Sequence, residues 1–176
     1  MLAFAANSIF NRLSLAEGEI GPSGFALIRT LSAALILLLL VALRPKRDDE
    51  KPKMNIASTL SLTIYILGFS FAYISLDTGI GALILFGGVQ ITMFIGALYK
   101  RERISNQRWL GSLIAVVGMV WLLAPSDEEL PVIEALLMGA AAIGWGCYSL
   151  IGRRASNPLL ETQRSFIFSI PLVALV

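Results

Sequence analysis

The sequence contains no histidine and only one cysteine, Cys147. Without histidine, the chain offers no imidazole for a metal site, a Ser-His-Asp triad or a proton shuttle. A single cysteine excludes an intramolecular disulfide framework and a thiolate metal cluster. The apolar segments also carry no paired carboxylates deep within them and no G-x-S-x-G element. We therefore expect a protein that is not an enzyme and that needs no cofactor or metal.

Charged residues are scarce as well. They make up 15% of the 176 residues, compared with about 25% in a typical soluble domain. Hydrophobic residues make up 56%, and the mean hydropathy is +0.76. A water-soluble globule of this length could not bury so much apolar surface, so the expected solvent is lipid. The net charge of +2 is too small to indicate a nucleic-acid partner.

Apolar segments of nearly membrane-spanning length recur along the chain. A transmembrane helix needs about 20 mostly apolar residues. We expect five full spans, which lie at Phe25–Leu43, Ile56–Leu76, Gly79–Tyr99, Trp109–Ala124 and Pro131–Gly152. Two further apolar segments, Met1–Leu15 and Ser165–Val176, are shorter and are expected to be partial spans. The predicted fold is an all-α membrane protein, a polytopic bundle of transmembrane helices.

The connectors between these segments alternate in charge. Lys and Arg gather in the connectors at 44–53, 100–108 and 153–154 and are absent from those at 16–24, 77–78 and 126–130. Connectors rich in Lys and Arg remain in the cytoplasm. We therefore expect a multi-pass protein of the inner, or plasma, membrane with its N-terminus in the cytoplasm, whose principal partner is the lipid bilayer.

Residues suited to helix starts stand at the expected boundaries. Pro22 and Pro131 lie where helices should begin, and proline suits a first helical turn. Asp77 and Ser105 are suited to cap the N-termini of the helices that follow them.

A short pattern recurs near both ends of the chain. The first copy consists of Phe4, Ser8 and Arg12, and the second consists of Trp145, Ser149 and Arg153. Each trio follows i, i+4, i+8 and so lies on one helical face. Because an odd number of expected spans separates the copies, the second copy must cross the membrane in the opposite direction. Inverted repeats are typical of secondary transporters, whose substrate sites lie near the membrane midplane at the repeat interface.

Two stretches of the sequence resemble a known family. The first stretch consists of 81–93, Glu102, Arg103, Ser105, Gln107 and Gly111. It resembles the EamA-type domain of the drug/metabolite transporter superfamily, and 145–159 resembles the opening of a second copy. The resemblance implies ten helices in two inverted five-helix copies that move small organic solutes across a membrane. On this basis residues 1–125 form the first repeat, with its first helix shortened, and residues 126–176 begin the second.

Gln90 is the polar side chain expected to lie deepest, because it stands near the middle of the apolar run 79–99. A polar group in hydrocarbon is unfavourable unless it is hydrogen-bonded. We therefore expect Gln90 either to contact the solute at the midplane or to bond a neighbouring helix. Gly88, Thr92 and Gly96 form a small-xxx-small stripe on the same run, which favours close helix packing.

Aromatic side chains recur on one face of the segment 56–76. Tyr65, Phe69 and Tyr73 follow i, i+4, i+8. Two phenol hydroxyls on one face would suit the wall of a cavity for aromatic or amphipathic solutes, whereas core or lipid contacts are the commoner use of such residues.

Candidate polar groups also occur at matching places in the two copies. Asn7 and Asn11 share a face of the first segment, and Trp145 and Tyr148 lie at the corresponding place in the second copy. If these groups face inward on both copies, they form a shared substrate site. The alternative is that they make hydrogen bonds between helices.

Arg29 is a cation inside an apolar run, about 10 Å along the helix axis from Pro22. Three uses are open to it. The side chain could extend to the outer membrane interface, pair with Asp77 on the same side of the membrane, or bind an anionic solute.

Two functions follow from these patterns. The first is a permease or exporter of small organic solutes such as amino acids or metabolites, working by alternating access between inverted repeats. The second is a truncated, non-transporting membrane fragment or an assembly-only integral membrane protein. A small-molecule solute is the expected partner of the first, and a homodimer is an assembly that the sequence allows.

Overall fold

The computed structural model describes residues 21–44, 55–102, 104–122 and 131–176. Within these ranges the chain forms helices and no strands. The helices are α2 (Pro22–Ala42), α3 (Ile56–Ala72), α4 (Thr78–Tyr99), α5 (Asn106–Leu122), α6 (Val132–Gly152) and α7 (Pro158–Ala174). The described part of the chain is thus an all-helical bundle, as predicted.

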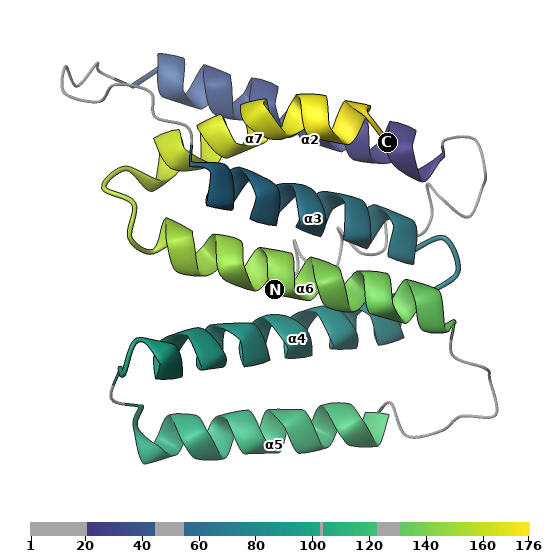
Figure 1. Ribbon diagram of the computed structural model, residues 1–176, viewed down its shortest axis with the longest axis vertical. Coiled ribbons are helices and arrows are strands. Elements are labelled where there is room, and N and C mark those ends of the chain that lie inside the picture. The colour runs from purple at the N-terminus through teal and green to yellow at the C-terminus, as the bar shows by residue number, and fades with distance from the viewer. Residues whose placement is uncertain (1–20, 45–54, 103, 123–130) are drawn as a thin grey trace.

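The helices lie side by side in an extended row rather than in a ring (Figure 1). The helices α2 and α7 pack together at one edge of the row, and α3 packs against both. The row continues through α6 and α4 to α5 at the opposite edge (Figure 1). Large apolar side chains point outward, among them Leu35, Ile36, Leu113 and Trp121. Such a surface suits lipid and not water.

Three of the helices are long and apolar enough to cross a membrane, namely α2, α4 and α6. The helix α3 is equally apolar but has 17 residues, because the chain turns at Tyr73 instead of continuing to Leu76 as expected. The helix α7 begins at Pro158, earlier than the expected Ser165, because Asn157 caps it. That the chain has five full spans therefore stays a prediction.

Helix starts agree with the residues predicted for them. The Asp77 side chain accepts hydrogen bonds from the backbone N–H groups of Gly79 (2.8 Å) and Ile80 (3.3 Å). Ser105 accepts a hydrogen bond from the Arg108 N–H group. Pro22 is the first residue of α2, and Pro131 directly precedes α6.

The helix α6 lies between α3 and α4, and glycine permits close contact on the α4 side. A Cβ atom at Gly88 would lie 2.6 Å from the Ala142 Cβ atom, and one at Gly146 would lie 2.6 Å from the Thr92 Cβ atom. A Cβ atom added at Gly96 would likewise come too close to the Leu150 side chain. The predicted small-residue stripe of α4 therefore packs against α6, and its packing role is confirmed.

On its other side, α6 approaches the backbone of α3. A Cβ atom at Gly144 would lie 2.6 Å from the Ser61 carbonyl oxygen and 2.9 Å from the Tyr65 backbone nitrogen. A Cβ atom at Gly68 would lie 2.7 Å from the Leu137 carbonyl oxygen. Hydrogen at these two positions lets the backbones of α3 and α6 come close enough for side chains to interdigitate.

Hydroxyl groups link α3 to α7. The Ser58 and Ser165 hydroxyl oxygens lie 2.8 Å apart, and both residues are buried. The Ser169 hydroxyl donates to the Ser165 carbonyl oxygen of its own helix and lies 3.4 Å from the Thr59 carbonyl oxygen. Each bond satisfies a polar group that would otherwise be unfavourable among apolar side chains.

The residues that follow α4 and α6, which belong to two of the basic connectors, lie on one side of the row, the left side in Figure 1, which we call the basic end of the bundle. Arg153, just after α6, forms a salt bridge with Glu102, just after α4, with 3.1 Å between Nη2 and Oε1. These two connectors therefore lie on the same side of the bundle, as the alternation of charge predicts.

Candidate functional site

Five aromatic side chains form a continuous ladder across the contact between α3 and α6. Ring centroids are separated by 4.8 Å between Tyr73 and Phe69, and by 5.5 Å between Phe69 and Tyr65. The ladder then crosses to α6, with 4.6 Å from Tyr65 to Trp145 and 5.6 Å from Trp145 to Tyr148. We call these five residues the aromatic ladder. Aromatic pairs favour such separations with tilted or edge-to-face rings.

Helical spacing and glycine together produce this arrangement. Tyr65 and Phe69 share one face of α3, Tyr73 follows them at the C-cap of that helix, and Trp145 and Tyr148 are neighbours on α6. Gly144, next to Trp145, allows α6 to approach the α3 backbone at Tyr65. Four of the predicted site residues therefore meet. Tyr65 and Tyr73 are buried, so in this structure they contribute to the core instead of lining an open cavity.

The guanidinium group of Arg29 reaches from α2 to this ladder. Its Nη2 atom donates a 2.7 Å hydrogen bond to the Tyr65 hydroxyl oxygen. Its Cζ atom lies 5.1 Å from the Tyr65 ring centroid and 4.9 Å from the Phe69 ring centroid. The cation is thus held by two aromatic faces and one phenol, an arrangement that is favourable when water is displaced.

One donor of this guanidinium is left over. The Nη1 atom of Arg29 is buried and has no hydrogen-bond partner in the described part of the chain. Asp77, the carboxylate considered as a partner, caps α4 instead. The predicted alternative of an Arg29–Asp77 pair is therefore wrong. Extension to the outer interface is also wrong for this structure, because the guanidinium points inward to α3.

Tyr148, at the α6 end of the ladder, connects it to α7. Its hydroxyl group donates a 2.9 Å hydrogen bond to the Thr162 hydroxyl oxygen. The ladder and its hydrogen bonds consequently join α2, α3, α6 and α7. Asn7 and Asn11, the remaining candidates for this site, lie outside the described residues.

Gln90 stands apart from the ladder, between α4 and α5. It is exposed and lines two adjoining cavities of about 610 and 360 Å³. The expectation that Gln90 is the most deeply buried polar side chain is wrong, because α5 packs loosely enough on α4 to leave this space. The larger cavity is mostly apolar and includes Gly87 and Met119, whereas the smaller one includes Glu102 and Arg153.

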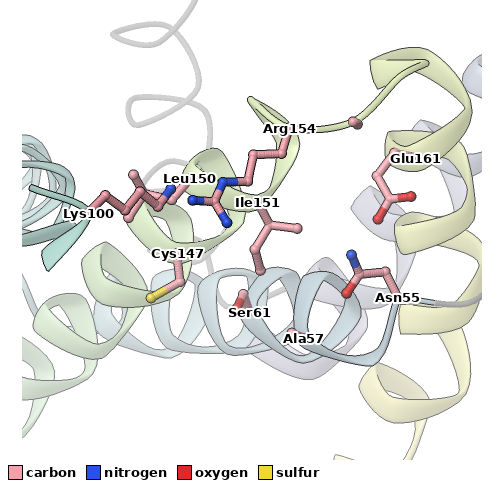
Figure 2. A pocket seen from close by; sticks show the side chains of 10 residues that line it. Asn55, Ala57, Ser61, Lys100, Cys147, Leu150, Ile151, Arg154 and Glu161 are labelled. Atoms are coloured by element: carbon pink, nitrogen blue, oxygen red, sulfur yellow. The ribbon is translucent and has the colours of Figure 1, made fainter. Parts of the chain in front are cut away.

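A third cavity, of about 710 Å³, lies at the basic end of the bundle (Figure 2). Arg154, Lys100 and Glu161 line it together with Asn55 and Cys147. The sequence analysis did not identify Lys100 or Glu161 as site residues. The available signal was Glu161 itself, an acid in the first turn of α7 that follows Arg153 and Arg154 in sequence.

The described ranges contain no group of side chains that could bind a metal ion. No three acidic or cysteine side chains within them are close enough to hold a metal ion. The groups that can bind a solute in these ranges are guanidinium, ammonium, carboxylate, amide, phenol and indole groups.

The apolar helices, the lipid-facing surface and the internal cation define a multi-pass helical membrane protein. The chain belongs to the EamA-like transporter family, whose pattern residues 1–124 match.

Similar proteins support the same class. Over all of its length the chain is 38% identical to "Uncharacterized protein PA1977" of Pseudomonas aeruginosa. It is 25% identical, over 97% of its length, to an "Uncharacterized transporter" of Archaeoglobus fulgidus. Over 76% of its length it is 24% identical to a "Probable amino-acid metabolite efflux pump" of Escherichia coli.

The chain spans 61% of the length of the first two of these relatives and 44% of the third. No solved structure matches it.

Proposed function

We propose that the protein containing this chain transports small organic solutes that carry a carboxylate group, such as amino acids or their metabolites, and exports them. The observation that carries this proposal is Arg29. Its guanidinium lies among aromatic side chains with a buried N–H donor unused. Ionised groups inside membrane helices are unfavourable unless paired, and they mark solute pathways. A solute carboxylate would supply the missing acceptor.

Similarity supports the direction and the solute class of this proposal. The Escherichia coli and Salmonella typhimurium relatives are named as probable amino-acid metabolite efflux pumps. An arginine fork binds a carboxylate through two parallel hydrogen bonds. Nη2 carries two N–H groups, so one of them can bond Tyr65 while the other joins Nη1 in binding the solute carboxylate.

The transport cycle that we propose is alternating access between two inverted repeats, with residues 1–125 in the first and 126–176 beginning the second. Tyr65 comes from the first part, and Trp145 and Tyr148 come from the second. A rocking motion of one part against the other would change the ladder and expose Arg29 to one side of the membrane at a time.

The proposed location is the inner, or plasma, membrane, with the N-terminus and the basic end of the bundle in the cytoplasm. A reporter fused after Lys51 is expected to be cytoplasmic, and one fused after Glu128 is expected to lie on the opposite side. Reporter enzymes that are active in only one compartment measure this directly. Equal activity of both fusions would contradict the proposed orientation.

The proposed function is tested by transport into proteoliposomes that contain the full-length protein. Radiolabelled neutral amino acids are expected to accumulate faster than in protein-free liposomes, and unlabelled amino acids are expected to compete. Absence of transport for every amino acid and related carboxylate, by protein that is folded and correctly inserted, would favour the alternative of a non-transporting membrane component.

Gln90 provides a second test of the transport pathway. The Gln90 side chain is exposed and lines both of the adjoining cavities between α4 and α5. We expect Gln90→Leu to lower the transport rate several-fold while changing the free energy of unfolding by less than about 0.5 kcal/mol. Ile91→Ala, at an exposed neighbour, is the control. Equal transport by Gln90→Leu and wild type would remove Gln90 from the pathway.

A further inference from the structure

The cavity at the basic end of the bundle carries charges of both signs on opposite walls. Figure 2 shows Arg154 and Lys100 on one side and Glu161 with Asn55 on the other. These residues come from the ends of α6, α4, α7 and α3 or lie next to them, so four helix ends border this open cavity. Cys147 and Ser61 line its inner part (Figure 2).

No salt bridge joins the charges on the opposite walls of this cavity in the part of the chain that the structure describes. The salt bridge at this end of the described bundle is between Arg153 and Glu102, and neither residue lines the cavity. The Oε1 atom of Glu161 is buried and lacks a hydrogen-bond partner in the described ranges. A buried carboxylate oxygen without a donor is unfavourable, so an ammonium group at this point would stabilise the site.

Glu161 also has a simpler role, because it lies in the first turn of α7, where the helix dipole favours an acid. That role requires only an acid near the helix start. It does not account for the burial of Oε1, or for the position of Arg154 and Lys100 on the opposite wall.

We propose that this cavity binds a small zwitterion, with its ammonium group at Glu161 and its anionic group at Arg154 and Lys100. The proposal rests on the proposed transport function and adds a second site, separate from Arg29, at the basic end. About 710 Å³ is enough space for an amino acid. The same charge pair occurs in the headgroup of phosphatidylethanolamine, and the two sources are separated by the experiment.

Cys147 gives a readout that is local to the cavity. The full-length protein is placed in phosphatidylglycerol nanodiscs, and the rate of maleimide labelling at Cys147 is followed by peptide mass spectrometry. The probes are leucine, 4-methylpentanoate, which lacks the ammonium group, and 3-methylbutylamine, which lacks the carboxylate. Leucine is expected to slow labelling at a concentration about tenfold lower than either analogue, because each lacks one charge-assisted contact.

Two charge-neutral variants complete the design. Glu161→Gln is expected to bind leucine no better than 4-methylpentanoate, and Arg154→Gln no better than 3-methylbutylamine. Arg108→Gln, which removes an exposed cation from the same end of the bundle, is expected to retain the preference for leucine. Nanodiscs that contain phosphatidylethanolamine test the lipid source. Protection of Cys147 by that lipid alone, lost in the same two variants, assigns the site to a headgroup.

Absence of protection by leucine and by phosphatidylethanolamine would overturn the proposal, and so would equal protection in wild type, Glu161→Gln and Arg154→Gln. Neither result contradicts the proposed transport function, because transport by the wild type and its dependence on Arg29 are measured separately. Conversely, leucine protection of Cys147 in a protein that fails to transport would support the cavity and contradict the proposed function.

Discussion

Replacing Gly144 with alanine is expected to lower the free energy of unfolding by about 1–3 kcal/mol, the usual effect of overpacking. The added Cβ atom would lie 2.6 Å from the Ser61 carbonyl oxygen and 2.9 Å from the Tyr65 backbone nitrogen. Both neighbours are backbone atoms of α3, which cannot move aside as a flexible side chain can. The two helices must therefore separate, and the contact between Tyr65 and Trp145 must weaken with them.

The matched control is Gly139→Ala on the same helix. A Cβ atom at Gly139 would meet nothing within 4 Å, and alanine is the better helix former. This variant is expected to be as stable as wild type or more stable. Unfolding of both variants in mixed detergent micelles, followed by circular dichroism, measures the difference. Equal stability of the two variants would contradict the close contact between α3 and α6.

Replacing Arg29 with glutamine is expected to reduce transport of carboxylate-bearing solutes by about 10- to 100-fold, the loss of one charge-assisted hydrogen bond. Glutamine still offers an amide N–H donor in the direction of Tyr65 but no charge for the solute. Stability is expected to be unchanged or raised, since the variant removes an ion that has no counter-charge in the described bundle.

Lysine at position 29 distinguishes charge from geometry. Arg29→Lys keeps the cation but lacks the planar fork that binds a carboxylate and stacks on Tyr65 and Phe69, so intermediate transport is expected. Arg44→Gln, at an exposed arginine just beyond α2, is the control and should transport as wild type does. Full transport by Arg29→Gln would remove Arg29 from the solute site. Loss of transport together with loss of stability would indicate a structural role.

The class of fold could be predicted from the sequence, because hydropathy and helix capping depend on residues that are close together in the chain. Asp77 and Pro22 start their helices at the predicted residues, and Gly88 and Gly96 form the predicted contact. The end of α3 was harder to predict, because the uncharged run continues through Tyr73 to Leu76 and only the turn into α4 ends the helix. Hydropathy does not distinguish a turn at the membrane edge from one more helical turn.

The candidate site was predictable only in part. The spacing of Tyr65 and Tyr73 placed them on one face, but their contact with Trp145 depends on which helix packs there. Gln90 was misjudged because its burial depends on how tightly α5 covers α4. The cavity at Glu161 joins the consecutive ends of α6 and α7 with the ends of α3 and α4, which are distant in sequence, and no local pattern predicts that contact.

The position of α6 has a consequence for biosynthesis. The helices α3 and α4 are consecutive in the sequence and are synthesised before α6, yet in the finished structure α6 lies between them. The contacts that hold α3 and α4 in place through α6 can therefore form only after α6 is synthesised. A nascent chain arrested before α6 emerges should be more accessible to protease than one arrested after it, which makes the arrival of this one segment the committing event of assembly.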